Sequence, residues 1–314
     1  MIRAGIVILL FVVYQLWGTG IHTAQAQNDL GRQFKAAQAE AGDTGTTADK
    51  LPDDTRPTDT TPATIAPPTP GAATGAPPGL GTPIGQITIP RIGADFYMVE
   101  GTDLKYLKEG PGHFSGTPLP GQAGNAAVAG HRTTYKAPFN RIDELEPGDQ
   151  ITIVTLQGTF TYEVLPQEPS TPGGAPLGHR IVTPKAVEIL ADKGDNRLTL
   201  MACNPKYSAQ QRIVVEAKLV GNPAPSTVLP GEVKNVDKGA LAGEELAGGD
   251  RSARMPSLLW ALLALAIWFA AWYLAHRRLH RWWRIAPYAV ALPLFAVALY
   301  ATFENITRLL PGAY

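Results

Sequence analysis

Alternating apolar and polar positions define a series of short segments between residues 81 and 220. QITIPRI (86–92) and QITIVTL (150–156) both open with QITI, in which polar and apolar side chains alternate with the period of a strand that has one buried face. Glycine and proline separate the segments, and QGTF joins two alternating runs as a hairpin does. Evenly spaced short strands with few helices are typical of a small β-barrel or sandwich. The pattern predicts strands at 86–92, 95–101, 125–131, 150–156, 160–165, 196–203 and 212–220, and short helical turns at 103–110, 137–145 and 184–191.

Uncharged apolar blocks lie outside this region, at 4–21, 257–275 and 285–303. A bilayer core roughly 30 Å thick requires about 20 apolar residues in a helix, so the two later blocks predict membrane spans. Buried core helices are the alternative, but helices of water-soluble proteins rarely lack a polar face for so long. The first block follows Arg3 and predicts a signal peptide, cleaved after Ala26, or a signal anchor.

The segment between the two later blocks, HRRLHRWWR (276–284), is strongly basic and carries two tryptophans. The positive-inside rule places such a loop in the cytoplasm. Arg3 places the N-terminus on the same side, so we expect residues from about 22 to 256 to be extracytoplasmic. The predicted location is the cell membrane, in contact with its lipid, with the folded part outside.

Two segments lack the apolar density of a folded core. Residues 27–80 are rich in Thr, Ala, Pro, Gly and Asp and contain a single aromatic residue, Phe34, which predicts a disordered linker. The predicted organisation is a signal peptide or anchor at 1–26, a linker at 27–80, a catalytic domain at 81–220, a second linker at 221–256, a span at 257–275, a cytoplasmic loop at 276–284, a span at 285–303 and an extracytoplasmic tail at 304–314.

Charge and cysteine content narrow the function classes. Lys plus Arg and Asp plus Glu are both 27, so the chain has no basic surplus for a nucleic-acid partner. The single cysteine, Cys203, excludes an intramolecular disulfide, and the absence of a Cys/His cluster argues against zinc. We expect no metal and no cofactor. The acidic residues between 166 and 195 show no clear ligand arrangement; they are Glu168, Glu188, Asp192 and Asp195.

A lone cysteine is either a small buried hydrophobe or a nucleophile. A nucleophilic thiolate needs a cation or base beside it and a donor for the developing oxyanion. His131 ends a strand-like run beside a loop, where it is a candidate base. His113 lies in a Gly-rich loop, where it either orients substrate or is solvated. Arg212 opens the strand after the cysteine strand, and it is either a donor in the same groove or an ordinary surface arginine.

Two stretches resemble the motifs of a known family. TLMAC (199–203), followed nine positions later by Arg212, resembles the TLxTC…R element of sortases, and 110–149 resembles the histidine-bearing region of class E sortases. The resemblance covers about 84–220. It implies an eight-stranded sortase-type β-barrel with short helices, here with membrane helices at both ends. It further implies that Cys203 is the nucleophile, His131 the general acid/base and Arg212 the clamp for oxyanion or substrate.

The resemblance also implies an activity. Sortases cleave LPxTG-type sorting signals, or LAxTG in class E, through a thioacyl enzyme that an amine resolves. The implied partners are proteins with such C-terminal signals and, as acceptor, a peptidoglycan precursor or a pilin amine. Two alternatives stay open: a sorting-signal protease with water as acceptor, and a non-catalytic extracytoplasmic binding domain.

One residue departs from the family pattern. Ala202 stands where sortases usually carry Thr, so we expect a reduced rate or an altered preference. Asn204, after the cysteine, fits the class E pattern. Tyr135 either shapes the substrate pocket or packs. Ala202, Asn204, Tyr135 and His113 are thus the candidate substrate-binding residues.

Overall fold

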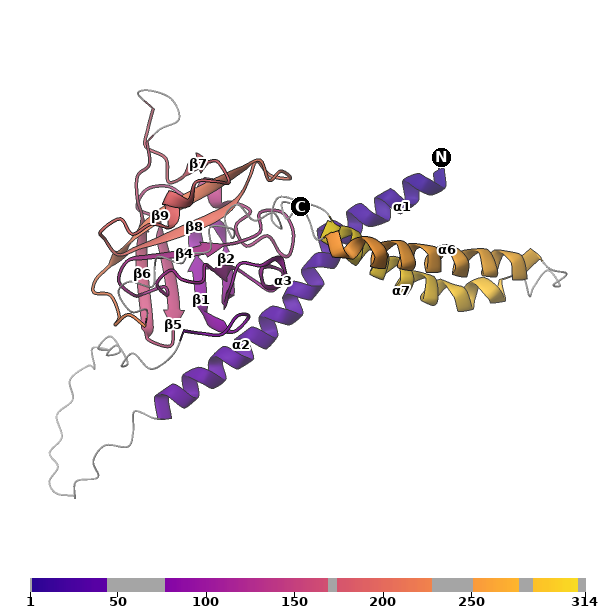
Figure 1. The fold of residues 1–314 in the computed structure, drawn as a ribbon, viewed down its shortest axis with the longest axis horizontal. Coiled ribbons are helices and arrows are strands. Elements are labelled where there is room, and N and C mark those ends of the chain that lie inside the picture. Colours follow the sequence, from indigo (N-terminus) through magenta and orange to yellow (C-terminus); the bar gives the residue numbers. More distant parts are fainter. Residues whose placement is uncertain (1, 44–76, 169–173, 228–250, 277–284, 310–314) are drawn as a thin grey trace, which may run out of the picture.

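The computed structural model describes residues 2–43, 77–168, 174–227, 251–276 and 285–309. A β-barrel lies beside a long N-terminal helix, and two further helices project together away from the barrel (Figure 1). The strands are β1 Pro83–Ile89, β2 Ala94–Glu100, β3 Gly112–His113, β4 Asn125–Ala129, β5 Gln150–Thr155, β6 Gly158–Val164, β7 Arg180–Val182, β8 Arg197–Asn204 and β9 Gln211–Val220. The helical elements are α1 Ile2–Val13, η1 Tyr14–Gly18, α2 Thr19–Asp43, η2 Pro90–Ile92, α3 Leu104–Leu107, η3 Ile142–Glu144, η4 Val187–Leu190, η6 Arg251–Ala253, α6 Arg254–His276 and α7 Ala286–Leu309.

The strands close on themselves. Their order is β6-β5-β1-β2-β3-β4-β8-β9-β7, and β6 also pairs with β9, which makes a ring of all strands except β7. The prediction of an eight-stranded barrel is therefore confirmed. β7 pairs with the first half of β9, outside the ring. The sequence did not predict β3 or β7, because segments this short show no alternation.

Alternation along each strand sorts side chains between two hydrophobic clusters. Ile87, Ile151 and Ile153 are fully buried inside the barrel, where inward-facing side chains fill a closed sheet of this size. β8 is buried on both faces. On the outer face Met201 belongs to a second hydrophobic cluster, which includes Ile189 of η4 and Phe114.

The first part of the expected linker is helical. Residues 27–43 belong to α2, which packs against the barrel near β2 through Leu30 and Phe34, 3% and 2% exposed. The Phe34 and Tyr97 rings lie 5.9 Å apart, and a Cβ at Gly31 would lie 2.6 Å from Cε2 of Tyr97. The prediction of disorder was wrong here because docking buries the apolar side of a segment too polar to fold alone. Residues 44–76 of that linker lie outside the described residues.

Two other predicted boundaries differ from those in the structure. Ala224, in the expected second linker, is 3% exposed, and its N–H donates to the Gly121 oxygen (2.8 Å), so residues 221–227 belong to the barrel. The helix expected at 285–303 continues to Leu309 and takes in the start of the expected tail. The expected basic loop lies outside the described residues, apart from His276 at the end of α6.

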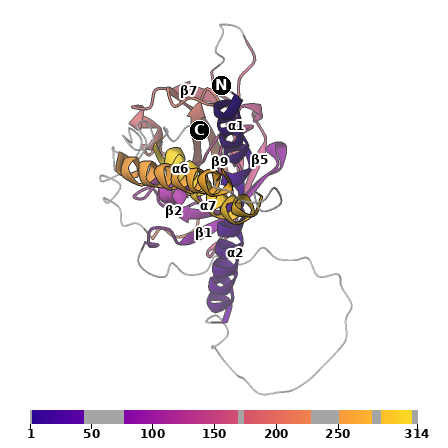
Figure 2. The ribbon, with the colours of Figure 1, turned by 90° about the vertical axis from the view of Figure 1, so that its right-hand side faces the viewer.

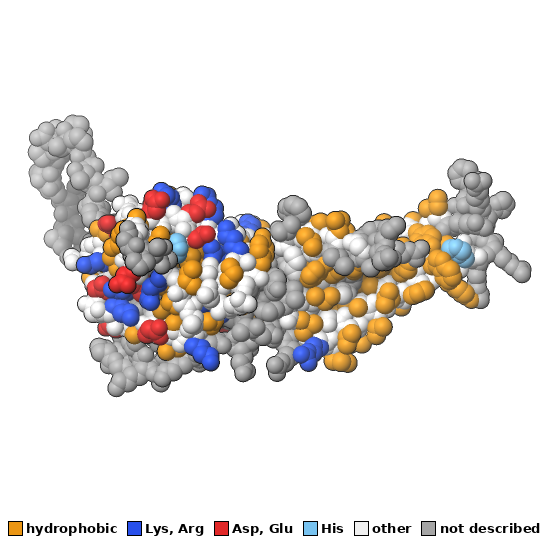
Figure 3. Space-filling view, turned by 90° about the horizontal axis from the view of Figure 1, so that it is seen from above, with side chains coloured by type: hydrophobic (Ala, Val, Ile, Leu, Met, Phe, Trp, Pro, Cys, Tyr) orange, Lys and Arg blue, Asp and Glu red, His pale blue; other side chains and the backbone are white. Residues whose placement is uncertain are grey.

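Within the described part of the chain, two helices are long and apolar enough to cross a membrane, Arg254–His276 and Ala286–Thr307. Apolar side chains cover this projecting region, whereas charged side chains gather on the barrel (Figure 3). Seen end-on, the projecting pair meets the long N-terminal helix beside the barrel (Figure 2). The first apolar block, 4–21, is divided among α1, the π-helical turn η1 and the beginning of α2.

Candidate active site

The only cysteine faces an arginine across two neighbouring strands. Cys203 in β8 pairs with Arg212 in β9, and directly opposed residues of an antiparallel ladder project to the same side. Arg212 is 2% exposed, and its Nη1 donates to the backbone oxygens of Ala209 (2.9 Å) and Gln211 (3.0 Å). Its Nη2 is buried and has no hydrogen-bond partner among the described residues. One nitrogen of the guanidinium therefore fixes the side chain, and the other makes no hydrogen bond within the described part of the chain.

His131 approaches from the other side of β8. β4 pairs with β8 in parallel, with Ala129 opposite Met201, and the Gly130 N–H donates to the Met201 oxygen (3.0 Å). Continuing this register by two residues brings His131 level with Cys203. Three neighbouring chain segments thus carry histidine, cysteine and arginine side by side, with the cysteine in the middle.

The environment of the thiol has opposing effects on its ionisation. Burial raises the pKa of Cys203 above its ordinary value, and this effect outweighs the nearby guanidinium groups of Arg212 and Arg132, which lower it. The thiolate is the nucleophilic form of a cysteine, and burial disfavours that form here.

Arg132 is a site residue that the sequence analysis missed. It is 4% exposed, and its Nη1 donates to the Asn204 side-chain oxygen (2.6 Å) and to the Cys203 backbone oxygen (3.3 Å). Its Nη2 lies 3.0 Å from a carboxylate oxygen of Asp143. Arg132 joins the end of β8 to the loop after β4. The one signal in the sequence was its place directly after His131.

Tyr135 packs against the imidazole. The rings of Tyr135 and His131 are 4.9 Å apart, and Tyr135 is 5% exposed. Its φ is 53°, and Lys136 and Ala137 also have positive φ, 59° and 42°. Non-glycine residues adopt this conformation only where surrounding contacts hold them. Of the two roles considered for Tyr135, packing describes its position, and a role toward substrate stays a prediction.

His113 is a buried part of the barrel wall rather than an open loop residue. It lies in β3 and is 2% exposed. Its Nδ1 is 2.7 Å from the Glu100 carboxylate, and its Nε2 is 2.9 Å from both the Pro118 oxygen and the Thr117 hydroxyl. Because the protein itself occupies both ring nitrogens, neither the solvated nor the substrate-orienting interpretation fits this geometry.

Ala202 faces the barrel interior. It is 3% exposed and belongs to the interior cluster with Leu200, whereas Met201 belongs to the outer cluster. Because strand side chains alternate, the thiol of Cys203 is on the outer side with Met201. A threonine at 202 would direct its hydroxyl away from the thiol. The expected effect of this departure on rate therefore has no support in the geometry.

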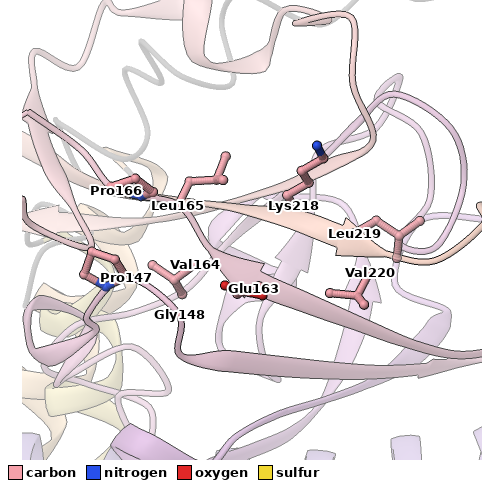
Figure 4. A pocket seen from close by; sticks show the side chains of 9 residues that line it. All are labelled: Pro147, Gly148, Glu163, Val164, Leu165, Pro166, Lys218, Leu219 and Val220. Carbon is pink, nitrogen blue, oxygen red and sulfur yellow. The ribbon is translucent and has the colours of Figure 1, made fainter.

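A hollow of about 380 Å³ lies elsewhere, at the seam where β6 meets β9 (Figure 4). Its lining includes Glu163 and Lys218, which are opposite each other in that ladder, and none of the candidate catalytic residues. Among the described residues, no group of three or more His, Cys, Asp or Glu side chains is placed to hold a metal ion.

The part of the chain that forms the barrel is also the part that matches known proteins. A family model described as the sortase domain matches residues 87–220. Sortase SrtE2 of Streptomyces coelicolor is 30% identical over 234 residues, which cover 70% of this chain and 79% of that protein. Sortase SrtE1 of the same organism is 30% identical over 227 residues, 70% of this chain, but the match spans only 55% of that protein. A solved structure of a Clostridium perfringens Sortase D5 transpeptidase has a TM-score of 0.44 and 24% identity, over 64% of this chain and 99% of that one. The chain belongs to the sortase family of cysteine transpeptidases.

Proposed function

We propose that this protein is a membrane-anchored transpeptidase that cleaves LAxTG- or LPxTG-type sorting signals and joins the cleaved protein to a cell-wall amine. The observation that carries the proposal is the alignment of His131, Cys203 and Arg212 on neighbouring segments. The similarity to SrtE1 and SrtE2 supports a class E assignment, and with it the LAxTG preference.

In the first half-reaction, His131 takes the proton of the Cys203 thiol, and the thiolate attacks the carbonyl carbon of the signal's Thr–Gly bond. The buried Nη2 of Arg212 donates to the oxyanion that forms. His131 then gives its proton to the departing glycine nitrogen. The C–N bond breaks, and a thioester joins the substrate's threonine to Cys203.

In the second half-reaction, an amine attacks the thioester and His131 accepts the amine's proton. The new amide bond forms as the C–S bond breaks, and the sulfur regains a proton. No oxidant or reductant is required. The amine is that of a peptidoglycan precursor or a pilin.

The apolar helices α6 and α7 anchor the enzyme, with the barrel on the extracytoplasmic side. The basic segment 276–284 supports this orientation through the positive-inside rule. Because Cys203 is the only cysteine, a small membrane-impermeant thiol reagent applied to intact cells should label it. Labelling only after the membrane is permeabilised would contradict the orientation.

The activity is tested on the full chain in lipid nanodiscs. Fluorescent LAxTG and LPxTG peptides are supplied with and without a diaminopimelate-type amine, and mass spectrometry follows three species: the thioacyl enzyme, the ligated product and the hydrolysed peptide. We expect ligation by the wild type, none by Cys203→Ala, and near-complete loss in His131→Ala and Arg212→Ala. A peptide with scrambled signal residues is the control.

Each alternative has its own outcome. Hydrolysis without ligation at saturating amine would identify a sorting-signal protease. The absence of a thioacyl adduct with either peptide, in a protein whose Cys203 resists alkylation, would favour a non-catalytic binding domain and overturn the proposal.

A further inference from the structure

The barrel, the N-terminal helix and the C-terminal helix α7 meet at Lys108, the residue after α3. The Lys108 ammonium lies 3.2 Å from a carboxylate oxygen of Glu304 in α7. The backbone oxygen of Lys108 accepts a hydrogen bond from the Thr23 hydroxyl of α2 (2.9 Å). The Lys108 and Glu304 side chains are 16% and 30% exposed, so water screens this ion pair only partly.

The same ammonium connects to the candidate active site. Nζ of Lys108 lies over the Tyr135 ring, 5.7 Å from its centroid, within the range of a cation–π interaction. The imidazole of His131 is a second neighbour of that ring, 4.9 Å away between centroids. A chain of contacts therefore runs from Glu304 through Lys108 and Tyr135 to His131.

Further contacts hold two members of this chain of contacts, Glu304 and Tyr135. The Tyr14 hydroxyl donates to the Glu304 carboxylate, and Gln15 donates to the Thr307 hydroxyl one turn later in α7 (2.9 Å). The Tyr135 N–H donates to the Thr19 hydroxyl (3.4 Å). The N-terminal helix thus fixes the carboxylate and also the backbone of the loop that carries Tyr135.

This loop requires such support. Tyr135, Lys136 and Ala137 have positive φ values in succession, a backbone conformation that costs on the order of 1 kcal/mol or more at each non-glycine residue. Figure 1 shows that the barrel-side end of α7 lies next to the N-terminal helix, where the Tyr14 and Tyr300 rings pack edge to face. The contacts that hold the histidine loop therefore come in part from the helices that we assign to the membrane.

We propose that Lys108 and Glu304 are positioning residues for His131, so that α7 is part of the catalytic unit as well as an anchor. Glu304 holds the Lys108 ammonium against the Tyr135 ring, and the ring holds the imidazole level with Cys203. This inference rests on the proposed function, because it assumes that His131 moves protons during the reaction.

The test compares full-length variants in nanodiscs by peptide turnover. Lys108→Met removes the cation and keeps most of the apolar stem; we expect kcat to fall about tenfold with little change in KM, because a shifted acid/base group slows chemistry more than binding. Lys108→Arg, which keeps a cation able to lie on the ring, should recover most of the loss. Glu304→Gln should lower kcat as well, by a smaller factor.

A matched control is available on α3. Lys105 makes the same type of contact with another ring, and its Nζ lies 4.6 Å from the centroid of Tyr106. Lys105→Met should leave kcat and KM at wild-type values. An equal fall in Lys105→Met and Lys108→Met would overturn the inference.

Exchanging the charges of Lys108 and Glu304 distinguishes a role in positioning His131 from a role in holding α7 against the barrel. The double variant Lys108→Glu/Glu304→Lys rebuilds the ion pair between the barrel and α7 but moves the cation off the Tyr135 ring. We expect kcat to stay as low as in Lys108→Met. Full recovery would mean that Lys108 only docks the helix, and the inference would fail.

A readout that does not depend on turnover keeps this inference distinct from the proposed function. In protein labelled with ¹⁵N-histidine, and with the His131 signals assigned through His131→Gln, the ring resonances should move in Lys108→Met and stay in place in Lys105→Met. Unmoved signals would overturn the inference even in an active enzyme. Wild-type protein that processes no peptide would overturn the proposed function instead.

Discussion

Nη1 of Arg132 lies 3.3 Å from the backbone oxygen of Cys203 and 2.6 Å from the side-chain oxygen of the next residue, Asn204. A single guanidinium thereby holds the end of β8 to the loop that follows His131. The same positive charge lowers the pKa of the thiol. Arg132 thus acts on both the position and the ionisation of Cys203.

Arg132→Met should reduce peptide turnover by about tenfold, because the loss of a buried charge-assisted contact releases the end of β8. It should also shift the pH midpoint of Cys203 alkylation by iodoacetamide to higher pH. Arg132→Lys retains the positive charge but loses the planar guanidinium that contacts several oxygens at once. The pH profile of its alkylation should therefore stay near that of the wild type, while its turnover falls. Arg141→Met, at an exposed arginine of the same loop, is the control and should change neither measurement.

Arg212→Met should slow alkylation of Cys203 at neutral pH by about tenfold. Burial raises the pKa of this thiol and the Arg212 charge opposes that rise. Without the charge the pKa rises further, so less thiolate is present at any pH below it, and the rate–pH curve moves to higher pH. Because the chain has one cysteine, intact-protein mass spectrometry reports this site alone. A curve that did not move would show that Arg212 does not act on the thiol.

Ala202→Thr should restore the family's usual residue without raising kcat. The side chain faces the interior, so the hydroxyl would be buried, at a cost of about 1–3 kcal/mol of stability if it finds no partner. Ala202→Val adds a similar volume with no hydroxyl, and the difference between the two melting temperatures isolates the polar contribution. A higher kcat in Ala202→Thr alone would mean that residue 202 reaches the substrate.

His113→Ala should reduce stability and leave the KM for peptide unchanged. The substitution removes the partner of the buried Glu100 carboxylate and the contacts to Pro118 and Thr117, which should cost about 3 kcal/mol or more. Thermal unfolding measures the loss, and kinetics are taken well below the variant's melting temperature. A raised KM with an unchanged melting temperature would restore the substrate-binding interpretation.

The sequence contained more of the fold than composition suggested. Alternation predicted most strands. Within TLMAC it also placed Ala202 and Cys203 on opposite faces of the strand, so the missing threonine of the family pattern lies on the face away from the thiol. In α2, Leu30 and Phe34 have helical spacing, but so narrow an apolar stripe cannot stabilise a helix alone. Its partner, Tyr97, is distant in the sequence.

The sequence by itself determined the properties that depend on neighbouring residues: the alternating strands of the barrel, the long apolar helices and the single thiol. Tertiary structure decided which distant side chains meet. The pairing of β8 with β4 and β9 brought His131 and Arg212 to either side of Cys203, and the barrel wall buried His113. Helix packing brought Glu304 to Lys108, 196 residues away. Local pattern is read along the chain, whereas contacts of this kind arise only when the strands and helices pack together.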